Sequence, residues 1–98
     1  MAFNNSQNRV TLKGFVKSEM KDITNFSIEF DLSVPRKAAS GERQMTDLLS
    51  IYVNKSSVIE FCKSHLKLNT PIIVKGEIRR FYNDKIYICS DDISVKSK

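Results

Sequence analysis

The chain has 98 residues, enough for one domain and too few for two. Lys and Arg number 16 against 11 Asp and Glu, so the formal net charge is +5, which favours an anionic partner such as nucleic acid. A small excess of this kind also serves solubility alone. No run approaches the ~18 apolar residues of a membrane span, and no apolar run precedes a cleavage site, so we expect no membrane association and a cytoplasmic location.

The two cysteines, Cys62 and Cys89, are too few for a disulfide framework, and no Cys/His spacing indicates zinc. Both lie in apolar surroundings, which predicts buried free thiols in a reducing compartment. The sequence has no Gly-rich phosphate loop, no Ser/His/Asp order and no cluster of metal ligands. We therefore expect neither an enzyme nor a cofactor.

Two strands are predicted in the first part of the chain. Period-2 alternation over 9–16 indicates a strand with one buried face, and Gly14 within it indicates a tight bend or a close backbone approach. The clearest amphipathic strand covers 26–34, and Pro35 is expected to end it because proline has no N–H for the ladder. Residues 1–7 are polar and are expected to be disordered.

The middle of the chain predicts a loop, a strand and a helix. A basic, Gly-containing loop covers 36–44, and a third strand follows at 48–53 with alternate apolar residues. An apolar stripe over 55–66 has helical spacing, and Ser57 with Glu60 three residues later is typical of a capping box.

The last part of the chain predicts a β-hairpin. The fourth strand covers 71–82 with Ile72, Val74, Gly76 and Ile78 inward, and the fifth covers 85–95. Five strands with a short helix between the third and the fourth is the order of the OB-fold, a small Greek-key barrel. We therefore predict a single all-β domain over 1–98, with its barrel over 8–96.

Several segments, taken in order and spacing, resemble bacterial single-stranded DNA-binding proteins. They are NRVTLKGFV (8–16), NFSIEFDLSV (25–34), SGE (40–42), TD (46–47) and LNTPIIVKGEIR (68–79). The resemblance covers residues 8–95 and implies an OB-fold that binds single-stranded DNA as a homodimer or homotetramer.

The chain departs from that family in its aromatic residues. Members usually stack bases on tryptophans, and this sequence contains no Trp. By position, Val34 and Leu48 stand where the first two rings belong, and Phe81 or Tyr82 stands near the third.

The chain also lacks the acidic tail by which chromosomal members recruit replication proteins, since it ends in the basic run SVKSK (94–98). Recruitment through such a tail is therefore not expected. The short form also resembles the primosomal replication protein of the B type, a dimeric OB-fold relative, and short plasmid or phage versions of the binding protein.

The first candidate binding residues lie at the tip of the predicted hairpin, where two cations and two rings are consecutive. They are Arg79, Arg80, Phe81 and Tyr82. Single-strand binding needs cations for the phosphates and rings for the base faces. The alternative is a solvated hairpin with Phe81 or Tyr82 packed on the barrel rim.

Further candidates share the predicted outward face of the strands. Lys13, Phe15 and Lys17 lie on the first strand, where Phe15 suits base stacking or, equally, a subunit interface. The later strands contribute Tyr52, Lys75 and Tyr87, each of which has a half-buried alternative.

Arg36, Lys37 and Arg43 form a basic loop that suits the clamping of a phosphate backbone, although basic loops are often only solvated. In the family that this sequence resembles, the matching loop contacts the single-stranded DNA.

The leading hypothesis is sequence-independent binding of single-stranded DNA in replication, repair or DNA transfer. The alternatives are a dimeric primosome-type accessory protein with weak DNA binding, and a preference for RNA.

Overall fold

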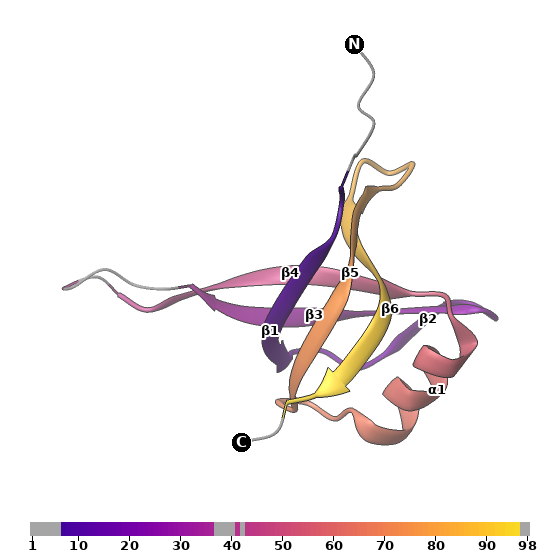
Figure 1. The fold of residues 1–98 in the computed structure, drawn as a ribbon, viewed down its shortest axis with the longest axis horizontal. Coiled ribbons are helices and arrows are strands. Elements are labelled where there is room, and N and C mark those ends of the chain that lie inside the picture. Colours follow the sequence, from indigo (N-terminus) through magenta and orange to yellow (C-terminus); the bar gives the residue numbers. More distant parts are fainter. Residues whose placement is uncertain (1–6, 37–40, 42, 97–98) are drawn as a thin grey trace, which may run out of the picture.

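The computed structural model describes residues 7–36, 41 and 43–96, which form six strands and one helix (Figure 1). The elements are β1 (Val10–Val16), β2 (Lys21–Thr24), β3 (Ser27–Arg36), β4 (Met45–Val53), α1 (Ser56–His65), β5 (Pro71–Arg80) and β6 (Ile86–Val95). Residues 1–6, for which the sequence predicts disorder, lie outside the described residues.

Five of the strands close into a barrel. Neighbouring strands follow the order β1-β5-β6-β4-β3-β2, and β1 also pairs with β3 through Phe15 and Val16. The β4–β6 pair is parallel and the other pairs are antiparallel. The barrel and its helix confirm the predicted OB-fold.

The strand β2 lies outside the barrel and was not predicted from the sequence. All four of its residues are exposed, so it lacks the alternating apolar face by which a strand is recognised. A tight turn holds it against β3, since the Thr24 hydroxyl accepts from the backbone N–H of Phe26 (3.0 Å) and bonds the Ser27 hydroxyl (2.8 Å). Because of this extra strand, the helix falls between β4 and β5.

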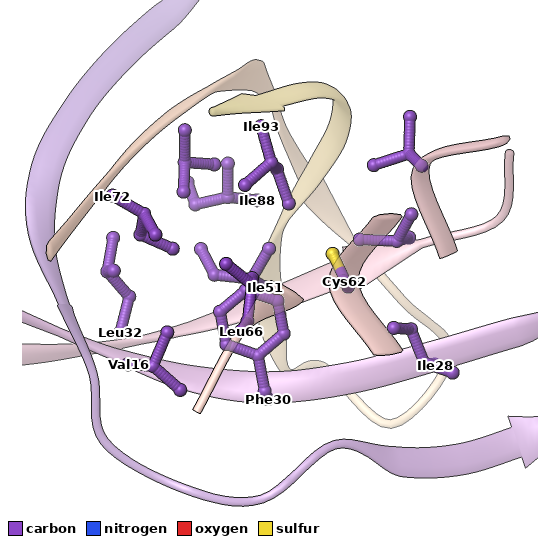
Figure 2. Packing of buried hydrophobic residues seen from close by; sticks show 13 residues of the cluster. Val16, Ile28, Phe30, Leu32, Ile51, Cys62, Leu66, Ile72, Ile88 and Ile93 are labelled. Carbon is purple, nitrogen blue, oxygen red and sulfur yellow. The ribbon is translucent and has the colours of Figure 1, made fainter. Parts of the chain in front are cut away.

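The core confirms the predicted alternation in the barrel strands. Figure 2 shows its side chains converging from the strands, from Cys62 on the helix and from Leu66 just after it. The most completely buried strand residues are Val16, Ile28, Phe30, Leu32, Ile51, Val53, Ile72 and Val74.

Two glycines allow strands to approach closely. A methyl group at Gly14 would overlap the carbonyl oxygen of Ser33, and one at Gly76 would overlap the carbonyl oxygen of Cys89. The close backbone approach predicted at Gly14 is therefore confirmed, and Gly76 has the same role on β5.

The structure corrects three local predictions. First, β3 continues through Pro35, which pairs with Thr46, because beyond Ser33 it has a neighbour on one side only and a missing N–H breaks no ladder bond. Second, no side chain caps α1 at Lys55, so the capping box does not form. Third, Ile78 is 46% exposed, because the hairpin rises past the barrel there (Figure 1).

The prediction for the cysteines holds in part. Both are free thiols, but only Cys62 is buried, whereas Cys89 is half-buried on the outer face opposite Glu77. In the described part of the chain, no helix is long and apolar enough to cross a membrane.

Candidate nucleic-acid interface

The hairpin between β5 and β6 ends in a tight turn from Phe81 to Lys85. The backbone N–H of Phe81 donates to the carbonyl of Lys85 (3.0 Å), and that of Asp84 donates to the carbonyl of Phe81 (2.9 Å). The side-chain oxygen of Asn83 accepts from the backbone N–H of Lys85 (2.9 Å). Asp84 has φ of 61°, a left-handed conformation that Asn and Asp adopt more readily than most residues.

Three rings pack together where this hairpin meets the barrel, and we call Tyr52, Phe81 and Tyr87 the ring cluster. The ring centres of Phe81 and Tyr52 are 5.0 Å apart, and those of Phe81 and Tyr87 are 4.6 Å apart. The Lys85 ammonium lies 4.9 Å from the centre of the Tyr87 ring and 3.7 Å from the Glu29 carboxylate. These contacts attach the hairpin to β3 and β4.

The two tyrosines predicted near the hairpin end up in different surroundings. Tyr87 lies on the outer face, opposite Arg79, but is only 8% exposed because Phe81, Tyr52 and Lys85 cover it. The predicted outward position of Tyr87 is thus found, and of the two alternatives for its ring the packed one is observed. Tyr82 is fully exposed at the turn.

A second group of predicted residues lies on β1 and β5. Lys13 and Lys75 are exposed on neighbouring strands, since Lys13 pairs with Ile73 and Thr11 with Lys75. Phe15 is 42% exposed on the same face of β1, and Lys17 is exposed just beyond it. The structure thus brings Lys13, Phe15 and Lys75 onto one outer surface.

Two of the candidate cations are paired within the chain. Arg79 binds Glu77 (3.1 Å), and Arg36 binds Asp47, where the guanidinium lowers the pKa of the carboxyl below its ordinary value. Among residues 7–36, 41 and 43–96, no carboxylate forms an ion pair with Lys13, Lys75 or Arg80. These three side chains are therefore exposed cations without an ion-pair partner among the described residues; Lys13 and Lys75 share the outer surface, whereas Arg80 pairs with Ile86 on the other face of the hairpin.

The loop candidates are remote from the ring cluster. Arg36 lies near the end of the β3–β4 arm, which projects sideways from the barrel in Figure 1. Arg43 is exposed beyond the arm's strands, and Lys37 lies outside the described residues. Leu48 on the same arm is 61% exposed. The arm thus presents an aliphatic side chain at a position where the family that this sequence resembles has an aromatic ring.

Sequence reasoning missed Lys85 and Asp84. Lys85 stands two residues before Tyr87, so the period-2 spacing of a strand provides a signal for their contact. Asp84 gives no such signal, because only the fold of the turn brings it beside Arg80 and Tyr82. Among the described residues, no group of three His, Cys, Asp or Glu side chains is arranged to hold a metal ion.

Comparison with known proteins finds similarity in structure only. No family model matches the chain, and no curated protein matches its sequence. A Plasmodium falciparum single-stranded DNA-binding protein, solved in complex with single-stranded DNA, superposes with a TM-score of 0.78 at 18% identity, covering 98% of this chain and 100% of that one. The small single-stranded DNA-binding protein of Streptomyces coelicolor has a TM-score of 0.73 at 16% identity, covering 94% and 95%.

A third solved structure is the dimeric N-terminal domain of PriB from Thermoanaerobacter tencongensis. It has a TM-score of 0.65 at 22% identity, covering 93% of this chain and 98% of that domain. At these identities, what the comparisons establish is that this chain has the same OB-fold as solved single-stranded DNA-binding proteins, over nearly its whole length.

Proposed function

We propose that this protein binds single-stranded DNA without sequence requirement, in replication, repair or DNA transfer. The observation that carries the proposal is the outer face of the barrel, where exposed Lys13 and Lys75 lie on neighbouring strands with Phe15, next to a hairpin that carries Arg80 and the exposed Tyr82 at its tip. Cations and rings on one surface are what backbone tracking and base stacking require. The likeness in fold to a protein solved with single-stranded DNA supports the same assignment.

Each part of this surface has a definite role in the proposal. Lys13, Lys75 and Arg80 neutralise phosphates and release counterions, so affinity falls as salt rises. Tyr82 and Phe15 offer exposed ring faces to bases. The ring cluster holds the hairpin in place beneath Tyr82, which lowers the entropy lost on binding.

Titration of a fluorescent thymidine oligonucleotide at low and moderate salt tests the proposal. We expect tight binding that weakens steeply with salt, and a loss of about tenfold or more when Arg79 and Arg80 are both changed to Ala. Lys63→Ala with Lys67→Ala removes the same charge from the helix end and serves as the matched control. If both double variants lose the same affinity for the oligonucleotide, binding depends on the total charge of the protein and not on a site at the hairpin.

A dimeric accessory protein with weak DNA binding is the second candidate. Val34 and Leu48 favour it, since both are aliphatic where rings are expected for stacking. Little binding to the oligonucleotide even at low salt selects this candidate. A uridine oligonucleotide in the same titration tests for a preference for RNA.

We also propose that the protein acts as a homo-oligomer. Within the described residues, β1 has no partner on its β3 side from Val10 to Gly14, and Ile78 and Ile86 are exposed on the neighbouring hairpin. An open strand edge beside apolar side chains favours pairing with another chain. Light scattering on the eluting protein distinguishes a monomer from a dimer or tetramer.

The proposed role is binding rather than catalysis, and the proposed location is the cytoplasm. Two free thiols, one of them half-buried, are typical of a reducing compartment.

A further inference from the structure

The turn of the β5–β6 hairpin contains a hollow that the general binding of phosphates and base faces leaves unexplained. Arg80, Phe81, Tyr82 and Asp84 line it. The hollow thus combines a guanidinium, two rings and a carboxylate within one turn. Nucleobases are flat, have polar edges and carry an attached phosphate, and this set of groups matches all three features.

Three of the lining residues suit any base. The exposed ring of Tyr82 is free to stack, and Phe81 is anchored against Tyr52 and Tyr87 and forms a fixed wall. The Arg80 side chain is exposed and, among the described residues, makes no ion pair. A planar guanidinium stacks on rings or binds phosphate, so these residues hold a nucleotide without selecting its base.

Asp84 is the residue that a sequence-independent binder does not need. Its left-handed conformation (φ 61°) requires a residue that tolerates this region, but Asn or Gly satisfies the same requirement without charge. Among the described residues, no cation forms an ion pair with its carboxylate. A carboxylate here repels phosphate, so a gain in binding from it has to come from a donor on the base.

We propose that this hollow is a subsite for one unstacked guanine base, with the Asp84 carboxylate accepting hydrogen bonds from its Watson–Crick edge. This inference rests on the proposed binding of single-stranded DNA and adds a base preference to it. Tyr82 stacks on the guanine ring, and Arg80 neutralises the adjoining phosphate. The two carboxylate oxygens accept from the neighbouring ring N–H and amino groups of guanine.

The other bases fit the carboxylate less well. Guanine is the one common base with two adjacent donors on its Watson–Crick edge. Thymine flanks its single N–H with two carbonyl oxygens, which a carboxylate repels. Cytosine and adenine each offer one amino group beside an acceptor nitrogen, so one carboxylate oxygen faces a lone pair.

The test compares oligonucleotides that alternate deoxythymidine with either deoxyguanosine or deoxyinosine. The two probes differ only in the guanine amino group, so differences in stacking and charge cancel. We expect wild-type protein to bind the guanine probe about fivefold more tightly than the inosine probe. In Asp84→Asn this ratio falls to near one, whereas Asp92→Asn, which removes a carboxylate outside the hollow, keeps the wild-type ratio. Circular dichroism confirms that both variants fold.

The outcomes separate this inference from the proposed function. Binding of both probes with equal affinity, or a guanine preference that survives in Asp84→Asn, overturns the subsite and leaves single-strand binding intact. Absence of binding to either probe and to a thymidine oligonucleotide at low salt overturns both. A guanine preference lost in Asp84→Asn alone establishes the subsite.

Discussion

The rings of Phe81 and Tyr52 meet edge to face, with centres 5.0 Å apart and planes at 78°. Phe81 belongs to the hairpin turn and Tyr52 to β4, so this contact joins two segments that are far apart in the chain. It leaves neighbouring Phe81 and Tyr82 with different roles, since one ring is attached to the barrel and the other projects into solvent.

Phe81→Ala should therefore mainly affect stability, and Tyr82→Ala should mainly affect oligonucleotide binding. The first removes a packed ring and should lower the free energy of unfolding by about 1–2 kcal/mol. The second removes a fully exposed ring and should change stability by less than about 0.5 kcal/mol, yet weaken oligonucleotide binding about fivefold or more. Urea denaturation and titration of the thymidine oligonucleotide measure the two quantities. A destabilised Tyr82→Ala with unchanged affinity would contradict this division.

Gly76→Ala should be strongly destabilising. The added methyl overlaps the carbonyl oxygen of Cys89, a backbone atom that cannot move without breaking the β5–β6 ladder. We expect a loss of about 3 kcal/mol or more in the free energy of unfolding. Gly41→Ala is the control, because its Cβ meets nothing within 4 Å and only the left-handed backbone (φ 84°) costs about 1 kcal/mol. Equal effects at the two glycines would show that β5 and β6 adjust to the methyl.

The buried thiol of Cys62 should make stability depend on pH in the alkaline range. Burial raises the pKa of Cys62 from its ordinary 9.0 to about 11. The protonated thiol is thus favoured in the folded state, so its stabilising effect is complete below pH 9 and is lost as pH rises towards 11. We expect a decrease of about 1–2 kcal/mol over this range, after allowance for solvent screening. Chemical denaturation at several pH values measures it, and Cys62→Ala should have a shallower decrease. An equal decrease in the variant would assign the effect to other groups.

Release of Arg36 from its ion pair should strengthen oligonucleotide binding if the β3–β4 arm contacts the bound oligonucleotide. Asp47 holds the guanidinium in an exposed ion pair, so Asp47→Asn frees one cation on the arm. We expect tighter binding at low salt and a salt slope steeper by about 1. Asp22→Asn, which frees Lys63 beside the helix, is the matched control and should leave the slope unchanged. No change in Asp47→Asn would exclude the arm from the interface.

Alkylation of Cys89 offers a direct footprint of the interface. This thiol is half-buried on the outer face, whereas Cys62 is fully buried, so a small maleimide should modify Cys89 about tenfold faster or more. A thymidine oligonucleotide should slow modification of Cys89 in proportion to its occupancy. Mass spectrometry of the modified peptides follows both sites. If the rate of Cys89 modification is unchanged at saturating oligonucleotide, the interface does not include the outer face of β6.

Much of the fold was predictable from local pattern. Strict alternation from Ile28 to Leu32 and from Leu49 to Val53 reflects strands with one face in the core, and the apolar residues of these runs are buried except Leu49, which is half-buried. Gly14 was also informative, since a glycine within a strand often marks a close approach of another backbone. Where such patterns were absent, as in the exposed β2, prediction failed.

The candidate site was predictable in its residue types but not in its arrangement. The order Arg79, Arg80, Phe81, Tyr82 indicated a binding hairpin, and alternation correctly assigned Tyr87 to the outer face. No local pattern shows that Phe81 folds back and covers Tyr87, because that contact also depends on Tyr52, a residue distant in the chain.

The sequence by itself therefore determined the strands with a buried face, the basic balance and the presence of rings beside arginines, because alternation and composition are local properties of a chain. Only the tertiary structure decided which rings are free, which cations are paired and that Asp84 shares a hollow with Tyr82. The covering of Tyr87 and the Arg36–Asp47 pair depend on contacts between different strands, which the closure of the barrel sets. The Arg79–Glu77 pair and the hollow at Asp84 depend on the geometry of the hairpin, which alternation and composition do not specify.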